Sequence, residues 1–260
     1  MIKPLPKSER DLVELSNVWM SFEDKEILKG ISLRVAPGKT CVIMGGSGVG
    51  KSVTLKLILG LLKPIRGEVC FDGVELGKLR ESGLRAIRKR VGMVFQGGAL
   101  FDSITVGENV GYRLSEQKLL PHTEIDARVS HCLATVGLPG IEEMMPANLS
   151  GGMVKRVAIA RAIASKPDLL LFDEPTAGLD PINAHHISKL ILRLRQQTAA
   201  TSIVVTHDLD CAFTVATDLL MMYKGEIIFD GLPDEMRKSS IPEVHQFLYP
   251  DDDRLGWKRV

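Results

Sequence analysis

One octapeptide has the glycines, the lysine and the serine that a phosphate-binding loop requires. The segment GGSGVGKS fits the pattern GxxxxGK[ST] and lies between the apolar run Thr40–Met44 and the helical pattern Lys51–Leu62. Its glycines allow backbone N–H groups to turn inward and form a nest for the β-phosphate of a nucleotide. Lys51 would bring a positive charge to the β and γ oxygens, and the Ser52 hydroxyl is a predicted ligand of Mg²⁺. The predicted phosphate-binding residues are Gly45, Gly46, Ser47, Gly48, Val49, Gly50, Lys51 and Ser52.

Two carboxylates follow a short apolar run and can complete that site. The run Leu169–Phe172 predicts a buried strand, and Asp173 and Glu174 emerge at its C-terminal end. Ligands of a parallel sheet bind at that end, so both side chains should lie near the phosphate loop. We expect Asp173 to hold Mg²⁺ through water, and Glu174 to polarise the water molecule that attacks the γ-phosphate.

Two single residues at the ends of other strands are weaker candidates for the same site. Gln96 follows the run VGMVF and could reach Mg²⁺ or the attacking water, whereas His207 follows the run SIVVT and could hydrogen-bond the γ-phosphate. A glutamine in this position is usually a plain loop residue, and a lone histidine is usually just partly buried. Spacing alone therefore leaves both catalytic roles open.

A second motif suited to anions lies much later in the chain. The segment LSGGM places Ser150, Gly151 and Gly152 ahead of the helical pattern Val154–Ala164. Free backbone N–H groups and the positive end of the helix dipole point outward at the start of a helix. The chain thus has two predicted anion sites, although one nucleotide needs only one phosphate loop.

The elements that must position these residues alternate between strands and helices. Two strands, Leu12–Phe22 and Ile27–Val35, are joined by a polar turn, and the runs LLLF and SIVVT show no alternation of polarity. Strands of that kind are buried on both faces, which predicts an α/β fold with a parallel sheet covered by helices. From about Leu100 to Asn148 the pattern changes to helices and loops, which indicates an inserted helical subdomain. The other expected elements are Glu68–Phe71, Val91–Phe95, Pro181–Gln196, Ser202–Thr206 and Asp208–Ala216.

Composition excludes several classes of protein. The 260 residues are 45% hydrophobic and 25% charged, which is typical of a packed globular protein. A formal net charge of +1 argues against a nucleic-acid partner, which would require a strong basic excess. The four cysteines form no CxxC pair, so we expect reduced packing residues in a cytosolic protein. The first residues do not read as a signal peptide, and no apolar run approaches the ~18 residues of a membrane span.

The order of these motifs resembles that of ATP-binding cassette (ABC) ATPase subunits. GGSGVGKS, Gln96, LSGGM, LLLFDE, Ala177–Asp180 and His207 resemble the Walker A loop, Q-loop, signature, Walker B motif, D-loop and H-loop of that family. The resemblance implies a RecA-like P-loop NTPase core with a mixed sheet, and ATP and Mg²⁺ as cofactors. It also implies an ATPase domain over residues 1–231, a helical subdomain inserted at about 98–153, and a C-terminal helix and tail over 232–260.

The resemblance further implies roles that spacing does not give. In this family two cassettes pair head to tail, and the signature helix of one caps the γ-phosphate of ATP held by the other. Ser150–Gly152 would then serve the neighbour's nucleotide, which explains the second anion site. Phe22 lies where the family places an aromatic ring against adenine, with Trp19 as the weaker alternative. Asp180, in the D-loop, is a further expected nucleotide-site residue.

Two departures from the family pattern stand out. Met153 occupies the fifth signature position, where glutamine is usual, and a thioether is a poor hydrogen-bond partner. Any polar contact from that position to the neighbouring nucleotide is therefore in doubt, whereas backbone contacts are not. The D-loop begins Ala177-Gly178 instead of the more usual serine-alanine.

The exact sequences of three segments point to one group within the ABC family. LSGGM, FQGGALFDSITVGENV and FDEPTAGLDPI resemble the ATPase subunit of MCE/Mla-type phospholipid transporters. This implies a homodimer that drives a transmembrane permease from the inner face of the cell membrane, with a lipid-binding MCE protein as a further candidate partner. The alternatives are an importer ATPase for another small solute and a regulatory ATPase of a cell-division or cell-wall complex. A soluble ABC protein of translation or DNA repair is a third alternative, but this chain lacks the second cassette or inserted modules usual there.

Two polar segments remain. The cluster Arg80–Arg90 reads as a solvated helix face. The stretch from about Ile241 reads as a tail, in which Phe247, Tyr249 and Trp257 flank the acidic run DDD. Because solvated tails need no aromatic residues, the tail is expected to pack on the partner subunit, with a disordered end as the alternative.

Overall fold

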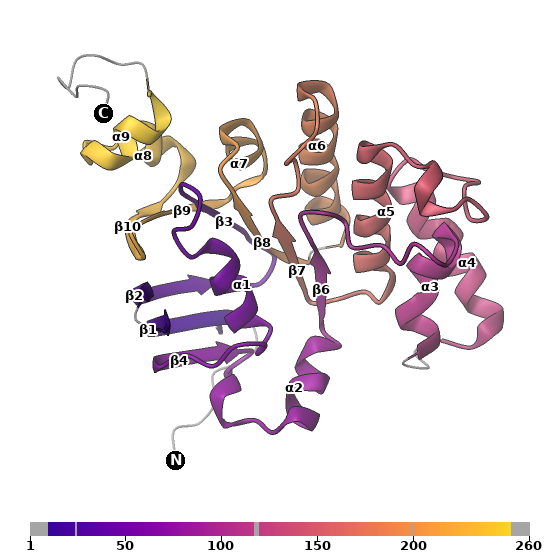
Figure 1. Cartoon of the computed structure of the whole chain (residues 1–260), viewed down its shortest axis with the longest axis horizontal. Coiled ribbons are helices and arrows are strands. Elements are labelled where there is room, and N and C mark those ends of the chain that lie inside the picture. The colour runs from indigo at the N-terminus through magenta and orange to yellow at the C-terminus, as the bar shows by residue number, and fades with distance from the viewer. Residues whose placement is uncertain (1–9, 24, 117–119, 199, 251–260) are drawn as a thin grey trace.

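A six-stranded sheet lies at the centre of the structure, a computed structural model that describes residues 10–23, 25–116, 120–198 and 200–250 (Figure 1). The strand order is β10-β9-β3-β8-β7-β6, in which the last five strands run parallel and β10 is antiparallel to β9. The predicted α/β class with a mixed sheet is therefore confirmed. The strands are β3 (Thr40–Met44), β6 (Val91–Val94), β7 (Leu169–Asp173), β8 (Thr201–Thr206), β9 (Asp218–Tyr223) and β10 (Glu226–Gly231).

The central strands are buried on both faces because alternate side chains enter two different hydrophobic cores. Val42 and Met44 of β3 point into a core shared with the helices of one face, whereas Cys41 and Ile43 point into a core on the other face. Strands buried in this way need apolar residues on both faces, as the runs Cys41–Met44 and Leu169–Phe172 have. The sheet therefore forms a rigid platform whose C-terminal edge carries the polar residues.

A second, antiparallel sheet covers one face of the platform. Its strand order is β2-β1-β4-β5, and its inner face closes the second core together with α1 (Lys51–Ile58). Gly67 of this sheet has φ 84°, and a Cβ there would lie 2.2 Å from the Asn17 carbonyl oxygen, so only glycine permits this close approach. The strands are β1 (Val13–Phe22), β2 (Lys25–Val35), β4 (Arg66–Phe71) and β5 (Val74–Glu75), followed by a 3₁₀ turn at Leu76–Lys78.

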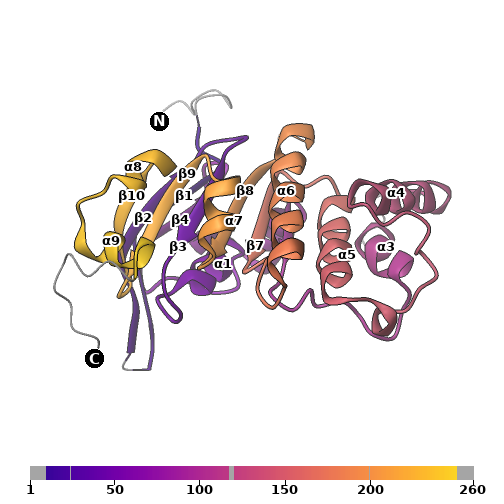
Figure 2. The same cartoon turned by 90° about the horizontal axis from the view of Figure 1, so that it is seen from above.

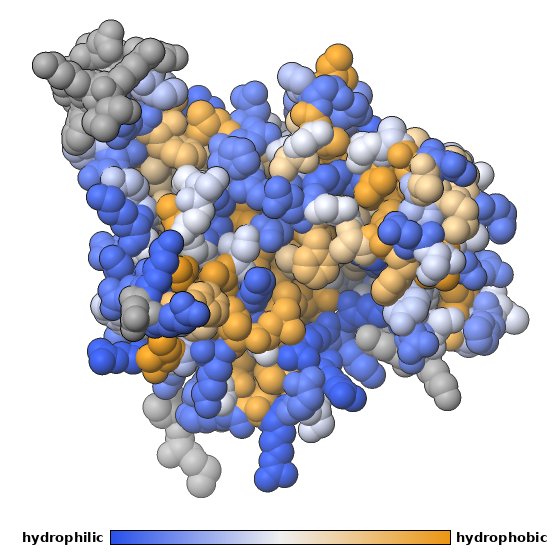
Figure 3. Space-filling view, viewed as in Figure 1, coloured by the Kyte–Doolittle hydropathy of each residue, from blue (hydrophilic) through white to orange (hydrophobic). Residues whose placement is uncertain are grey.

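The basic cluster forms α2 (Glu81–Arg88), but it is not simply a solvated face. Figure 3 shows hydrophilic side chains along the lower edge of the molecule, where α2 lies in Figure 1. Arg88, however, donates hydrogen bonds of 3.0 Å to the carbonyl oxygens of Leu59 and Gly60, just beyond the end of α1. Arg90 pairs with acidic side chains on two other segments. The prediction of a solvated face was therefore wrong for these two arginines, which join separate parts of the fold.

A group of helices extends the structure beyond β6 and forms one end of the molecule (Figures 1 and 2). It contains α3 (Val106–Glu116), α4 (His122–Thr135) and a 3₁₀ turn at Pro146–Asn148, and it continues into α5 (Gly151–Ala164). The α5 helix packs against α3 and α4 and also against β6 and α6. It begins at Gly151 rather than after Met153, so the predicted subdomain boundary near residue 153 falls inside a continuous helix.

The C-terminal part folds back onto the platform. Helices α6 (Pro181–Thr198) and α7 (Leu209–Val215) cover the face of the first core, followed by α8 (Pro233–Arg237) and α9 (Pro242–Leu248). Val244 and Leu248 of α9 are buried in that core. The predicted tail from Ile241 was therefore wrong up to Leu248, because two apolar residues four positions apart anchor a helix. Trp257 and the run DDD lie outside the described residues. Among the residues that the structure describes, no helix is long and apolar enough to span a bilayer.

Candidate nucleotide-binding site

The predicted phosphate loop joins β3 to α1 at the C-terminal edge of the sheet. Gly45 has φ 147°, and a Cβ there would lie 2.4 Å from the Met222 carbonyl oxygen. Val49 packs against the core beneath the loop. A Cβ on Gly46 or Gly48 would meet no atom within 4 Å, so this side of the loop is open. The loop is therefore fixed to the protein on one side and presents backbone to a ligand on the other.

Lys51 points back under this loop rather than into solvent. It is 7% exposed, and its Nζ donates hydrogen bonds of 2.8 and 2.9 Å to the carbonyl oxygens of Gly45 and Gly46. The same ammonium lies 3.4 Å from Glu174 Oε1. One buried cation thus connects the phosphate loop to the carboxylate at the end of β7, as the sequence predicted for a shared site.

Ser52 and Asp173 meet across the same edge of the sheet. The Ser52 hydroxyl donates a 3.0 Å hydrogen bond to Asp173 Oδ1, although the two residues are 121 positions apart in the chain. Burial raises the pKa of the Asp173 carboxyl, whereas the Ser52 hydrogen bond acts in the opposite direction. A hydroxyl and a carboxylate oxygen are hard donors of the kind that Mg²⁺ prefers, and a cation would relieve the burial of the carboxylate. These two residues therefore fit a magnesium ion.

Glu174 has an unusual backbone conformation for a residue other than glycine. Its φ is 46°, in the left-handed region, and its N–H donates a 2.9 Å hydrogen bond to the Val205 carbonyl oxygen of β8. Its Oε2 lies 3.0 Å from His207 Nδ1 and also accepts a 3.3 Å hydrogen bond from the His207 N–H. The strain of this turn places one buried carboxylate between Lys51 and His207.

Gln96 reaches the site through its backbone. Its side chain is exposed after β6, and its carbonyl oxygen accepts a hydrogen bond from Lys155 Nζ of α5. Among the described residues, no hydrogen bond joins its side-chain amide to Asp173 or Glu174. The predicted side-chain role of Gln96 toward Mg²⁺ or water stays a prediction.

The second anion motif forms the start of α5. Ser150 caps the helix and its Oγ accepts a 3.3 Å hydrogen bond from the Met153 N–H. Ser150 and Gly151 are exposed, whereas a Cβ on Gly152 would lie 3.1 Å from Asn183 Oδ1. In both ribbon views α5 lies beyond β6 and β7, on the side away from α1 (Figures 1 and 2). Within the described chain, no hydrogen bond connects Ser150–Gly152 to the phosphate loop, so the two anion motifs are separate sites.

Two further predicted residues lie at the edges of this region. Asp180 caps α6: its carboxylate accepts hydrogen bonds from the Asn183 N–H at 3.0 Å, from the Asn183 side chain at 2.6 Å and from the Ile182 N–H at 3.0 Å, and these bonds lower the pKa of the carboxyl. Phe22 ends β1 and is 44% exposed, whereas Trp19 donates a hydrogen bond within its own sheet. Phe22 is therefore the freer ring of the two, and contacts of Phe22 and Asp180 with ATP stay predictions.

Comparison with known proteins decides the family. Residues 28–177 match the family model described as ABC transporter. The chain is 41% identical to the intermembrane phospholipid transport system ATP-binding protein MlaF of Haemophilus influenzae, over 94% of this chain and 92% of that protein. This chain belongs to the ABC transporter family.

Further relatives agree with this ABC assignment. The chloroplastic protein TRIGALACTOSYLDIACYLGLYCEROL 3 of Arabidopsis thaliana is 40% identical, over 91% of this chain and 73% of that protein. A solved dimeric structure of the ATP-binding cassette MJ0796, in a post-hydrolysis state bound to ADP and Pi, matches with a TM-score of 0.77 and 33% identity. It covers 85% of this chain and 98% of that one. The fold is that of an ABC cassette, and the chain is an ATPase of that type.

Lys155 is a functional candidate that the sequence analysis did not identify. It is 5% exposed on the buried face of α5, where its Nζ bonds to the Gln96 carbonyl oxygen. Little in the sequence distinguishes it, because α5 carries apolar residues on most of its sides and buries Gly152 and Ile159 together with Lys155. A lysine among such residues can equally extend its charged end to solvent.

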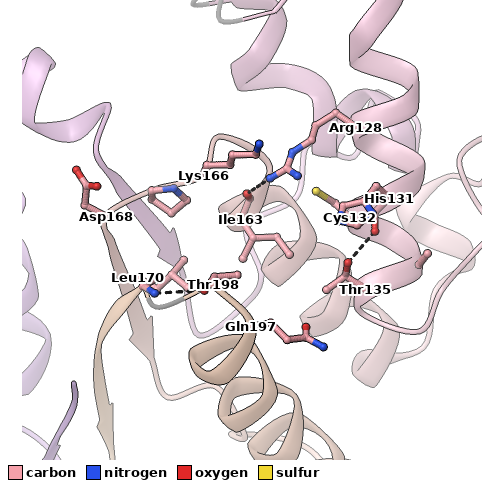
Figure 4. Close-up of a pocket in the computed structure, with 13 residues that line it drawn as sticks. Arg128, His131, Cys132, Thr135, Ile163, Lys166, Asp168, Leu170, Gln197 and Thr198 are labelled. Carbon is pink, nitrogen blue, oxygen red and sulfur yellow. Dashed lines mark hydrogen bonds between the residues drawn. The ribbon is translucent and has the colours of Figure 1, made fainter. Parts of the chain in front are cut away.

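A cavity elsewhere in the ABC fold does not belong to this site. It has a volume of about 770 Å³ and lies between α4 and the C-terminal ends of α5 and α6, with Arg128, Lys166 and Asp168 among its lining residues (Figure 4). These residues adjoin the N-terminal end of β7, opposite the end that carries Asp173 and Glu174. None of the predicted site residues lines it, so the nucleotide site remains at the C-terminal edge.

Proposed function

We propose that this chain is the ATP-hydrolysing subunit of a phospholipid transporter. It works as a homodimer at the inner face of the cell membrane, beneath a transmembrane permease and without a nucleic-acid partner. The convergence of Lys51, Asp173 and Glu174 on one buried edge supports the ATPase site. Similarity to MlaF, a phospholipid transport ATP-binding protein 41% identical to this chain, supports the phospholipid cargo, and a lipid-binding MCE protein is a further proposed partner.

The phosphate loop and Lys51 bind the triphosphate. The space beside Gly46 and Gly48 is open, so the backbone N–H groups of the loop can receive the phosphate oxygens there, while Lys51 supplies the charge. Lys51 must exchange its contact with the Glu174 carboxylate for one with phosphate, so ATP binding releases Glu174 for catalysis. Ser52 and Asp173, with Gln96 as a third ligand, would hold Mg²⁺, which would supply positive charge beside the phosphates.

Glu174 and His207 act on the attacking water. A carboxylate oxygen of Glu174 accepts a hydrogen bond from the water molecule and then takes its proton, while the water oxygen forms a bond to the γ-phosphorus. The bond from the γ-phosphorus to the bridging oxygen breaks, and ADP and inorganic phosphate leave. His207, 3.0 Å from Glu174 Oε2, orients that carboxylate and donates to the γ-phosphate. Gln96 supports the same water, and Phe22 stacks on adenine.

The start of α5 completes the site of the neighbouring subunit. Ser150 and Gly151 are exposed at the helix N-terminus, with Gly152 buried behind them, and this end of a helix favours a negatively charged phosphate. ATP becomes part of the dimer interface, and hydrolysis removes that contribution to closure. Asp180 accepts a hydrogen bond from the side chain of Asn183, which in turn lies next to Gly152. Asp180 thereby rigidifies the loop ahead of α6. The resulting cycle of closure and opening drives the permease between two states.

Purification of the tagged chain from membranes in mild detergent tests this proposal. We expect a transmembrane permease to co-purify, bound phospholipid to be detected by mass spectrometry, and the complex to hydrolyse ATP. A complex with a cell-wall regulatory protein, or with a permease that carries an amino acid or a metal, would contradict the cargo. Failure of the intact complex to hydrolyse ATP would contradict the enzymatic part.

A further inference from the structure

Lys155 is a buried cation that the proposed mechanism does not use. Only 5% of it is exposed, and its Nζ donates to the Gln96 carbonyl oxygen and, at 3.5 Å, to the Glu174 carbonyl oxygen. Burial lowers the pKa of its ammonium, although Asp173 and Glu174 act in the opposite direction. A charge placed in such surroundings carries a solvation cost, which its contacts must offset.

A second cation attaches the loop after Gln96 to the same helix. Arg161, six residues after Lys155 on α5, donates hydrogen bonds of 2.7 and 2.6 Å to the carbonyl oxygens of Gly98 and Ala99. Gly98 has φ 77°, and a Cβ there would lie 2.7 Å from a methyl group of Val154. The backbone of residues 96–99 therefore lies directly on α5 and follows its position.

Only Lys155 of these two cations also reaches the catalytic turn. The Glu174 carbonyl oxygen that it contacts also accepts a 3.1 Å hydrogen bond from the Ala177 N–H. The Glu174 side chain on the same residue contacts Lys51 and His207. A displacement of the Lys155 ammonium would thus shift the backbone that aims this carboxylate.

We propose that Lys155 is a positioning residue that couples the two ATP sites of the dimer. It ties the helix that receives the partner's phosphate to the Gln96 loop and Glu174 of its own chain. This inference rests on the proposed function of Ser150–Gly152. Because α5 is a continuous helix from Gly151, movement of its first turn onto a phosphate is transmitted one turn along to Lys155. Binding at one site then changes the geometry of the other, which is the definition of coupling between sites.

Lys155→Met tests this role because methionine keeps most of the length and the apolar stem of lysine but cannot donate a hydrogen bond. We expect kcat for ATP to fall by about tenfold or more, as for a small misplacement of catalytic groups. The Hill coefficient of hydrolysis should fall toward one, while the Kd for ATP stays unchanged. Lys155→Arg, which keeps the donors, should restore part of the turnover.

Ile159→Val is the matched structural control. Ile159 lies one turn further on the same buried face of α5, and its side chain has no polar atom. We expect this variant to lower the melting temperature without changing the Hill coefficient, whereas Lys155→Met should not melt earlier than wild type. A packing defect would lower turnover and melting temperature together. If Lys155→Met shows that pattern, the positioning role is overturned.

Amide hydrogen exchange provides a readout that does not depend on activity. In Lys155→Met the amides of Gly98 and Ala177, which flank the two contacted carbonyl groups, should exchange several-fold faster than in wild type or Ile159→Val. Unchanged exchange at both amides would overturn the inference. Absence of ATP hydrolysis by the wild-type chain would instead count against the proposed function, and exchange would still decide the Lys155 contact.

Discussion

Replacing Glu174 with glutamine removes one charge from a buried pair while keeping the shape of the side chain. Glu174 Oε1 lies 3.4 Å from Lys51 Nζ, and the two side chains are 11% and 7% exposed. With an effective dielectric constant of about 20, their mutual attraction is about 5 kcal/mol before desolvation is subtracted. In Glu174→Gln, Lys51 keeps its two carbonyl acceptors, so we expect the free energy of unfolding without ATP to fall by only about 1–3 kcal/mol.

The same substitution should affect binding and chemistry in opposite directions. ATP no longer competes with a carboxylate for Lys51, so Mg·ATP should raise the melting temperature of Glu174→Gln more than that of wild type. Turnover should fall by about 10²–10⁴-fold because the water has lost its general base, which corresponds to about 3–5 kcal/mol in the barrier. The ATP-bound dimer should then accumulate.

Three assays on one preparation separate these effects. Thermal unfolding with and without Mg·ATP measures binding, phosphate release measures turnover, and size-exclusion chromatography measures dimerisation. Glu124→Gln is the control, since this glutamate is exposed in the first turn of α4, within the group of helices at one end of the molecule. Turnover near the wild-type value in Glu174→Gln, or a smaller stabilisation by ATP than in wild type, would refute the assigned role.

Four further substitutions test other parts of the site. Lys51→Ala should raise the Kd for ATP by at least about tenfold in a calorimetric titration, because it removes a charged hydrogen bond to phosphate. Burial raises the pKa of Asp173 in the folded protein above its value in the unfolded chain. The stability that this carboxyl contributes is therefore fully present at a pH below its pKa in the unfolded chain, and is lost as the pH rises through its pKa in the folded protein. Asp173→Asn should therefore melt no earlier than wild type at neutral pH without Mg²⁺, yet lose Mg²⁺-dependent ATP affinity. Phe22→Ala should weaken ATP binding without lowering the melting temperature, whereas Trp19→Ala should lower the melting temperature, and the reverse pattern would exchange their roles.

Much of the site was predictable because its chemistry is local in sequence. The phosphate loop, Asp173-Glu174 and Ser150–Gly152 are each contiguous, and the buried strands before them show which edge of the sheet they occupy. Parallel pairing of β3, β7 and β8 then brings the first two together. The fold class followed from the same strands, which are apolar at nearly every position.

The remaining features depend on contacts between residues far apart in the chain. The attachment of Arg88 to Leu59 spans 29 positions, and that of Lys155 to Gln96 spans 59. In sequence such a side chain is simply a charge, and a solvated surface is the commoner location for it. The resemblance implied a C-terminal helix within 232–260, but the sequence did not place α9 at Pro242–Leu248, since seven residues with aromatic and acidic neighbours give little periodicity.

The central claim is that each ATP site combines the Lys51 of one subunit with the signature of the other. Gly151→Asp disables the signature half without a steric defect in its own chain, because a Cβ there lies 3.7 Å from Leu179, an ordinary contact. Its negative charge would oppose the approach of a phosphate. Lys51→Ala disables the other half.

Two mixed dimers with the same substitutions therefore give the most direct test, with phosphate release measured on differently tagged, purified pairs. When one subunit carries both changes and its partner is wild type, each site has one defective half, and we predict no competent site. When Lys51→Ala and Gly151→Asp lie on opposite subunits, both defects fall in one site, and the other should still bind and hydrolyse ATP. Wild-type-like hydrolysis by the first dimer would contradict the account, since the signature would then act within its own chain or not at all.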